Sequence, residues 1–245
     1  MGRSAVNKML DKVADTIFPY LYRSPKFGKS KFWTIYMVNR LISFLGYSNY
    51  TRAIEYPWCL SRVKDGKNIL EVGCVTSYFS HVLSTKKRDM HGIDLREYPS
   101  KPKKMRFMRE DIRTIELDKD FFDVIVSIST IEHIGLDGYG TEIKDNNGDL
   151  VAMKRLKEAL KPGGRFLITV PYAGKFGYTS VFTRIYDEDR IAKLTEGYIV
   201  SEKSYFIYQS RRWAKVSKEK AQEWGKPERA KFAIICLALS KQEGK

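Results

Sequence analysis

The sequence contains few cysteines: Cys59, Cys74 and Cys236 are widely separated among 245 residues. An odd number of dispersed cysteines argues against a disulfide framework and against a cysteine metal cluster. Proteins without structural disulfides are typical of reducing compartments. We therefore predict a cytoplasmic protein with no bound metal ion.

The sequence also lacks a run of about 18 apolar residues, the length that a membrane-spanning helix needs. Residues 1–15 carry acids and have no apolar core, which predicts no signal peptide. The most apolar stretch is residues 32–47, FWTIYMVNRLISFLGY, interrupted by an Asn-Arg pair. We expect a lid or core helix there. The alternative is an interfacial helix, which would make the protein peripheral to a membrane.

Glycine is scarce where a nucleotide-binding turn would need it. Residues 68–77, NILEVGCVTS, predict a buried strand, a turn at Gly73 and the start of a helix. This order is the first half of a nucleotide-binding βαβ unit. A dinucleotide pyrophosphate requires three glycines in the turn, and only Gly73 is present here. The turn therefore favours a ligand that has no pyrophosphate.

Positive charge is abundant, with a net charge of +15, and it is concentrated in the two flanks. Residues 1–68 carry 12 Lys and Arg against 4 Asp and Glu, and residues 201–245 carry 11 against 5. Residues 69–200 are nearly neutral, with 21 against 20. Basic flanks favour an anionic partner such as RNA, membrane headgroups or an acidic substrate. The alternative is a solubilising surface.

Strand and helix patterns alternate through the centre of the chain. Expected strands are 69–73, 90–94, 105–109, 121–127 and 165–170, and expected helices are 55–63, 77–84, 148–160 and 187–194. Two β-rich runs, 198–208 and 231–240, are expected to pair antiparallel at the sheet edge. Alternating units imply a doubly wound α/β sheet with its ligand at the carboxyl ends of the strands. We expect residues 1–54 to be an N-terminal helical extension or lid, and residues 55–245 the main domain.

Five motifs occur in a specific order. They are Glu71-x-Gly73, Asp94 at the end of the second strand, Asp111 after the third, FDVIVS at 122–127 and LKPGGRF at 160–166. In this order they resemble the class I S-adenosylmethionine (SAM)-dependent methyltransferases over roughly residues 55–240. The resemblance implies SAM as cofactor. It also implies a Rossmann-like, mostly parallel sheet of seven strands whose last strand is antiparallel.

The resemblance implies a role for each residue around SAM. Glu71 and Gly73 would receive the amino acid portion, Asp94 the ribose hydroxyls and Asp111 the adenine amino group, through hydrogen bonds to charged acceptors. The expected cofactor residues are Glu71, Gly73, Cys74, Ser77, Asp94, Leu95, Asp111, Ile112 and Ser127. As alternatives, Asp94 is a turn acid and Asp111 caps a helix.

The segment STIEHIG, residues 129–135, follows the fourth expected strand and would face the acceptor. Histidine has an ordinary pKa of about 6.5, which suits it to accept a hydroxyl proton near neutral pH. We therefore expect His133, with Glu132, to be catalytic; the alternative is that both only shape the loop. The pair is also similar to the metal site of quinone-type O-methyltransferases, but Ser129 replaces the first Glu, so no metal is expected.

The acceptor is the least defined part of the sequence. Tyr139, Tyr172, Arg184 and Tyr186 are expected to line its site. No Asn/Asp-Pro-Pro-Tyr tetrapeptide follows the fourth strand, so catalytic motifs give no support for a nucleic acid substrate. The motifs EYPW, STIEHIG, NGD, VPY and RIYD resemble small microbial methyltransferases of sugars and surface polysaccharides, which implies O-methylation of a small hydroxylated, glycan or glycolipid acceptor. An RNA methyltransferase and a non-catalytic SAM-binding protein at a membrane surface remain alternatives.

Overall fold

The computed structural model describes residues 51–63, 66–75, 77, 79–84, 88–99, 101–136, 145–180, 183–210 and 212–242. The apolar stretch at 32–47 and Tyr139 lie outside the described residues. The chain divides into two compact units, residues 1–54 with 208–214 and residues 55–207 with 215–245. The second unit contains all five motifs and is described below.

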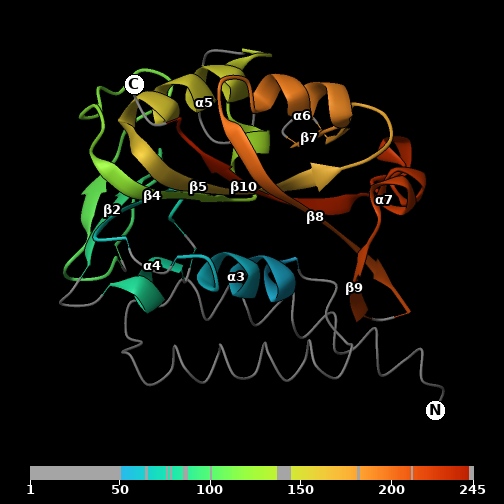
Figure 1. The fold of residues 1–245 in the computed structure, drawn as a ribbon, viewed down its shortest axis with the longest axis horizontal. Coiled ribbons are helices and arrows are strands. Elements are labelled where there is room, and N and C mark those ends of the chain that lie inside the picture. Colours follow the sequence, from blue (N-terminus) through green and yellow to red (C-terminus); the bar gives the residue numbers. More distant parts are fainter. Residues whose placement is uncertain are drawn as a thin grey trace. The chain divides into compact units, whose positions relative to one another are not determined.

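The strands of this unit belong to an eight-stranded sheet in the order β3-β2-β1-β4-β5-β10-β8-β9 (Figure 1). The strands are β1 (Asn68–Val72), β2 (Asp89–Ile93), β3 (Arg106–Met108), β4 (Phe122–Ile128), β5 (Leu160–Tyr172), β8 (Ile199–Gln209), β9 (Arg212–Val216) and β10 (Ala233–Ser240). Strands β1 to β5 pair in parallel, and β10 runs antiparallel to both β5 and β8. The doubly wound α/β prediction is confirmed, with eight strands rather than seven because β9 extends the edge beyond β8.

Helices cover both faces of the sheet. They are α3 (Arg52–Leu60), α4 (Phe79–Leu83), α5 (Gly148–Ala159), α6 (Glu188–Leu194), α7 (Lys218–Trp224) and two 3₁₀ turns, η1 (Ile131–His133) and η2 (Pro227–Arg229). Figure 1 shows α5 and α6 on one face, and α4 with residues 55–60 of α3 on the other. A short hairpin, β6 (Gly177–Ser180) with β7 (Thr183–Ile185), forms a separate two-stranded sheet. No helix among the described residues is long and apolar enough to span a bilayer.

The central strands are apolar along their whole length because both of their faces are covered. Ile69 in β1, Ile125 in β4, Phe166 in β5 and Ile235 in β10 are all fully buried. Ile125, Phe166 and Ile235 form one continuous core with the inner faces of α5 and α6. The covered faces leave the ends of the strands as the places where polar side chains can meet a ligand.

Strand β5 begins five residues earlier than the sequence predicts. Helix α5 passes directly into it, because the helix cap Leu160 already has extended dihedral angles. Gly163 has a φ of +70°, which glycine adopts without strain. The Lys-Pro-Gly-Gly segment therefore ends the helix as predicted, but it lies within the strand rather than in a loop.

Candidate functional site

The carboxyl ends of β1, β2 and β4 lie side by side where the order of the strands in the sheet reverses. Strand β1 lies between β2 and β4, with Val72 opposite Ile93 on one side and opposite Ser127 on the other. From β1 the chain adds β2 and β3 along one edge of β1, and it then returns to add β4 along the other edge. In doubly wound sheets a ligand binds at such a switch point. Glu71, Gly73 and the residues that follow β2 and β4 are brought together here.

The turn after β1 (Gly73, Cys74, Val75 and Ser77, hereafter the cofactor turn) requires glycine at its first position. Gly73 has a φ of +76°, in the left-handed region that favours glycine. A Cβ atom on Gly73 would lie 2.2 Å from Oγ1 of Thr130. The cofactor turn therefore lies directly against the segment that leaves β4.

Glu71 joins β1 to the start of α4. Its side chain is 1% exposed. One carboxylate oxygen, Oε2, accepts a hydrogen bond from the Ser80 amide at 3.0 Å and a second one from the Ser80 hydroxyl. A carboxylate close to the N-terminus of a helix is also stabilised by the helix dipole. Glu71 thus orders the turn that would receive a ligand.

Asp94 fixes the cofactor turn from the neighbouring strand. Its Oδ2 accepts hydrogen bonds from the Val75 amide and from Nη2 of Arg96, both at 3.0 Å. Its Oδ1 accepts from the amide and from Nε of Arg96, again at 3.0 Å. The Arg96 side chain is 38% exposed, whereas that of Asp94 is 6% exposed. These hydrogen bonds hold Asp94 to both the cofactor turn and the turn that follows β2.

Asp111 follows β3 and forms an ion pair with Arg113 at 2.6 Å. Burial alone would raise the pKa of Asp111, but hydrogen bonds from the Arg113 side chain and amide outweigh it and lower the pKa. Ile112 is buried beside it, and Leu95 is half-buried. The amide of Asp94 donates to the Met108 carbonyl at 3.2 Å, so the two acids follow adjacent strand ends.

Cys74 and Ser77 serve the packing of the cofactor turn. Cys74 is fully buried, and a Cβ on Gly92 would lie 2.7 Å from its Sγ. Burial, with the charges of nearby acids, raises the pKa of its thiol, which therefore stays protonated. The Ser77 hydroxyl accepts from the Phe79 amide at 3.1 Å and so caps α4. The Tyr98 hydroxyl donates to the Ser77 carbonyl at 3.3 Å.

Ser127 is fully buried in β4, opposite Val72. Its hydroxyl has no hydrogen-bond partner among the described residues. An unsatisfied buried hydroxyl costs about 1–3 kcal/mol. This cost at the carboxyl end of the central strand is consistent with a polar ligand at the switch point.

His133 and Glu132 lie in η1, just beyond the end of β4. Glu132 is 2% exposed, and its Oε1 lies 3.9 Å from Nε2 of His133. The His133 side chain is 20% exposed. The imidazole therefore faces a buried carboxylate while part of it stays accessible, an arrangement that suits a proton acceptor oriented by an acid.

Arg184 is fully buried in β7, away from any open surface. Its guanidinium donates to the carbonyls of Ile134 at 2.7 Å, Asp145 at 3.1 Å and Asn146 at 3.2 Å. Its Nε lies 3.9 Å from Oδ2 of Asp149. Arg184 was expected to line the acceptor site; instead it bonds to the two chain segments that flank residues 137–144.

Tyr172 and Tyr186 are also fully buried. The Tyr186 hydroxyl donates to Oδ2 of Asp149 at 3.0 Å, and the Tyr172 hydroxyl donates to Oε2 of Glu188 at 3.0 Å. Burial raises the pKa of both phenols. Neither tyrosine therefore lines an open surface, because each hydroxyl bonds to an acid of the protein itself.

Two buried acids were missed by sequence reasoning. Glu55 in α3 is fully buried, and its Oε1 accepts from the hydroxyls of Ser129 at 2.6 Å and Thr169 at 2.7 Å. Asp149 is fully buried between Tyr186, Arg184 and Arg190. The signal for Glu55 was an acid beside aromatic residues in a predicted helix, but a single sequence does not show which face of that helix is buried.

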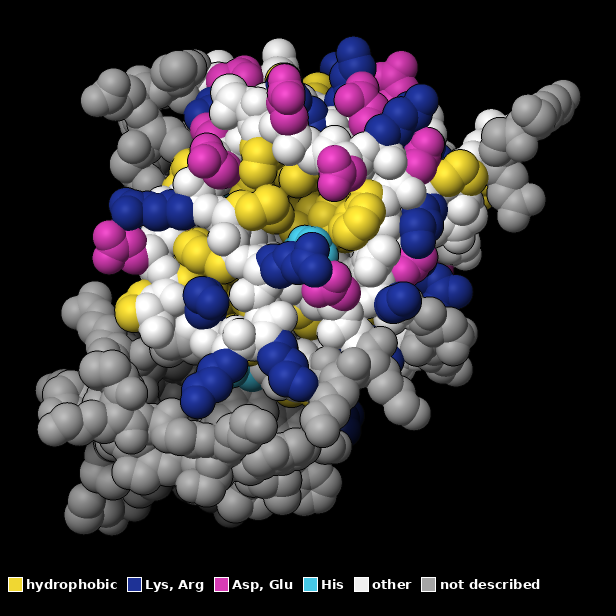
Figure 2. Space-filling view, turned by 90° about the vertical axis from the view of Figure 1, so that its left-hand side faces the viewer, with side chains coloured by type: hydrophobic (Ala, Val, Ile, Leu, Met, Phe, Trp, Pro, Cys, Tyr) yellow, Lys and Arg dark blue, Asp and Glu magenta, His cyan; other side chains and the backbone are white. Residues whose placement is uncertain are grey.

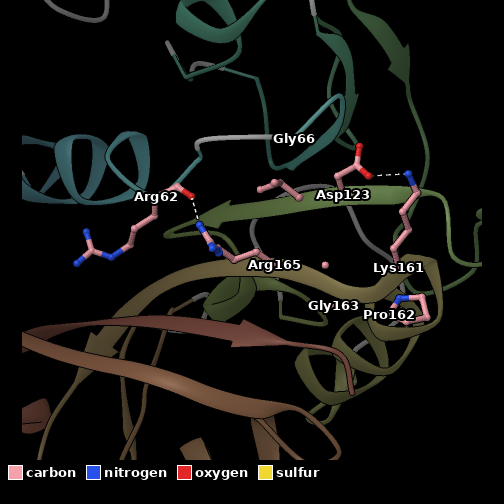
Figure 3. Close-up of a pocket in the computed structure, with 9 residues that line it drawn as sticks. Arg62, Gly66, Asp123, Lys161, Pro162, Gly163 and Arg165 are labelled. Atoms are coloured by element: carbon pink, nitrogen blue, oxygen red, sulfur yellow. Dashed lines mark hydrogen bonds and ion pairs between the residues drawn. The ribbon is translucent and has the colours of Figure 1, made fainter. Parts of the chain in front are cut away.

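A hollow at the opposite ends of β4 and β5 is separate from these residues (Figure 3). It is lined by Arg62, Gly66, Asp123, Val124 and residues 161–165. Figure 3 shows two contacts among its lining residues. Lys161 pairs with Asp123 at 2.5 Å, and Nη1 of Arg165 donates to the backbone carbonyl of Arg62 at 2.6 Å. Asp123 also accepts from the amides of residues 67 and 68, so the FDVIVS motif anchors the start of β1.

Residues 63–237 match the family described as "Caenorhabditis protein of unknown function, DUF268". Over 124 residues the chain is 27% identical to the uncharacterized methyltransferase YdaC of Bacillus subtilis strain 168. That match covers 46% of this chain and 62% of YdaC, which is less than two thirds of the relative's length.

Two solved structures are similar in fold. The 1,6-didemethyltoxoflavin-N1-methyltransferase of Burkholderia thailandensis, with 1,6-didemethyltoxoflavin and S-adenosylhomocysteine (SAH) bound, has a TM-score of 0.56 at 12% identity, covering 90% of this chain and 93% of that one. The [4+2]-cyclase SpnF has a TM-score of 0.59 at 13% identity, covering 81% and 84%. Such low identities establish a shared fold and not a shared reaction. The chain therefore belongs to the DUF268 family and has the Rossmann-like α/β fold of the class I SAM-dependent methyltransferases.

Proposed function

We propose that this protein is a SAM-dependent methyltransferase. The observation that carries the proposal is the cofactor turn at the switch point, with Gly73 in the left-handed region and Asp94 bonded to the Val75 amide at 3.0 Å. This turn combines a close approach at one glycine with acids on either side. That combination suits a ligand with an ammonium group and a diol and without phosphates.

The residues present fit this cofactor. Glycine is required at position 73, because a side chain there would collide with Thr130. Asp94 would hold the ribose and Asp111 the adenine, with Leu95 and Ile112 beside the ring. The buried, unsatisfied hydroxyl of Ser127 supplies one more polar group at the same strand ends. When bound, SAM supplies an activated methyl group on a sulfonium.

In the proposed mechanism the protein aligns the acceptor oxygen with the methyl group and excludes water. His133 accepts the acceptor's hydroxyl proton on its imidazole. Glu132, with its Oε1 3.9 Å from Nε2 of His133, stabilises the imidazolium that forms. General-base assistance of this kind is worth about 10²–10⁴ in rate. The buried side chains of Arg184 and Tyr186 hold the neighbouring chain segments in place.

We further propose a small hydroxylated, glycan or glycolipid acceptor. The partly exposed imidazole of His133 supports a hydroxyl group as the reacting group, and the small-molecule substrate named for the Burkholderia thailandensis enzyme supports the size class. The basic flanks favour RNA or membrane headgroups as an alternative partner. On the face seen in Figure 2, the Lys and Arg side chains of the described residues stand among acidic and apolar ones.

The proposal is tested by incubating the protein with methyl-tritiated SAM and either a bacterial glycan and glycolipid extract or total RNA. We expect label in the glycan or glycolipid fraction, with a mass gain of one methyl group on a hydroxyl. Label in RNA alone would replace the proposed acceptor class. Wild-type protein that binds neither SAM nor SAH would contradict the proposed activity itself.

A further inference from the structure

Two consecutive residues of α3 are linked to the cofactor turn: Tyr56 bonds to Ser77, and Glu55 bonds to Ser129, the neighbour of the Thr130 that packs against Gly73. We propose that they are positioning residues that set the shape of this turn and so the affinity for SAM and SAH. This inference rests on the proposed function and deepens it, because it assigns to α3 a part of the cofactor site. Both residues precede all five sequence motifs, and none of those motifs predicts them.

Glu55 acts on the Gly73 end through Ser129. Its Oε1 accepts from the Ser129 hydroxyl at 2.6 Å and from the Thr169 hydroxyl at 2.7 Å. The Ser129 amide donates in turn to the Thr169 carbonyl at 3.0 Å and to its Oγ1 at 3.1 Å. One buried carboxylate therefore holds the residue that leaves β4 against β5.

Ser129 needs such support because its backbone is strained. Its φ of +42° lies in the left-handed region, which costs a residue other than glycine roughly 1–2 kcal/mol. The strained conformation directs the next residue, Thr130, toward the cofactor turn. The Thr130 side chain occupies the space where a Cβ of Gly73 would lie. Glu55 thus holds in place the segment whose Thr130 side chain packs against Gly73.

Tyr56 acts on the other end of the cofactor turn. It is 8% exposed, and its hydroxyl lies 3.3 Å from Oγ of Ser77. Its ring packs against Phe79 with centroids 6.3 Å apart. Since the Ser77 hydroxyl also caps α4 through the Phe79 amide, Tyr56 holds the helix start to which the turn leads.

This arrangement accounts for a turn with one glycine where three are usual. Val75 and Ser77 limit how closely a ligand can approach the backbone, so affinity depends on the turn being held in its bound shape. Preorganisation raises affinity by removing the cost of ordering the site on binding. Glu55 and Tyr56 supply that order from outside the turn.

The experiment is calorimetric titration with SAH of the full chain and of variants that separate hydrogen bonding from packing. Glu55→Leu removes the acceptor oxygen, whereas Glu55→Gln keeps a carbonyl oxygen in the same place. We expect SAH binding about tenfold weaker in Glu55→Leu, about 1.4 kcal/mol, and within about twofold of the wild type in Glu55→Gln. In a Ser129→Ala background Glu55→Leu should add little, because the two residues act in series.

Tyr56→Phe removes one oxygen and leaves the ring, so we expect SAH binding about threefold weaker with little change in melting temperature. Tyr178, 42% exposed in β6, gives the matched control Tyr178→Phe, which should bind like the wild type. If Glu55→Leu does not fold, Ser129→Ala and Tyr56→Phe decide the question. Wild-type SAH binding with all of these variants within twofold would overturn the inference, whereas absence of wild-type binding would overturn the proposed function.

Discussion

The two halves of the candidate site are built differently. On the β1–β3 side, acids follow the strand ends and hold the cofactor turn by its amides, as Asp94 does with Val75 at 3.0 Å. On the β5–β7 side, Arg184 and Tyr186 are fully buried and bond to the protein's own carbonyls and to Asp149. The first half has polar groups at the carboxyl ends of the strands. The second half consists of buried side chains that bond to neighbouring chain segments. A residue in the first half is expected to affect ligand binding, and one in the second half stability.

The largest expected effect is on stability. Arg184→Met leaves the buried carboxylate of Asp149 with fewer partners and removes the guanidinium that donates to four backbone carbonyls. Breaking a buried ion network costs about 3–5 kcal/mol. We expect the free energy of unfolding, measured by urea denaturation, to fall by that amount. Arg229→Met, at an exposed arginine, is the control. Equal stabilities of the two variants would remove the distinction between the halves.

The next effect concerns turnover. His133→Ala should lower kcat by about 10²-fold or more, since a general base contributes 10²–10⁴. SAM affinity should stay within about twofold of wild type, because His133 lies beyond β4 and not in the cofactor turn. The measurement is transfer of tritiated methyl from SAM into the labelled acceptor fraction. Unchanged turnover would remove His133 from the chemistry and leave it as a loop residue.

Asp94→Ala gives the corresponding change in the first half. Hydrogen bonds to a charged group are worth about 1.5–3 kcal/mol, so SAH affinity should fall roughly 10- to 100-fold. Asp89→Ala is a matched control, because Asp89 lies at the other end of the same strand and pairs with Arg106 at 3.3 Å. If calorimetry on both variants shows that only Asp94→Ala loses affinity, the distinction between the two halves of the site is supported. Equal losses would show a general effect on β2.

The smallest effect is a pH dependence at Asp111. Its pKa in the folded protein is lowered by Arg113, which more than offsets the effect of burial. The ion pair therefore stabilises the fold above the ordinary carboxyl pKa, and this stability is lost as pH falls through the lowered value. Because the pair is partly exposed, we expect less than about 1 kcal/mol. Asp111→Asn should flatten the free energy of unfolding between about pH 4 and pH 2 relative to wild type.

The difference between the halves also explains what a single sequence could reveal. The alternation of strands and helices predicted the doubly wound sheet, because buried parallel strands are apolar throughout, as β4 is. Asp94 and Gly73 were predictable because sheet topology alone brings strand ends together. Arg184 and Tyr186 were not, because the direction of a side chain depends on which loops pack over it.

Glu55 shows the same limit from the other side. Its partners Ser129 and Thr169 stand 74 and 114 residues away in sequence, so no local pattern connects them. The strain at Ser129, with a φ of +42°, is likewise set by tertiary contacts and not by residue type. Sequence motifs locate the residues around a cofactor turn, and the structure is needed to identify what holds the turn in place.

The central claim is that the turn at Gly73 binds a cofactor without a pyrophosphate. Calorimetric titration of the wild-type protein with SAM, and separately with NAD⁺, tests it most directly. The account predicts one SAM site of about micromolar affinity, close to −8 kcal/mol, and no NAD⁺ binding. Binding of NAD⁺ with no detectable binding of SAM would contradict it.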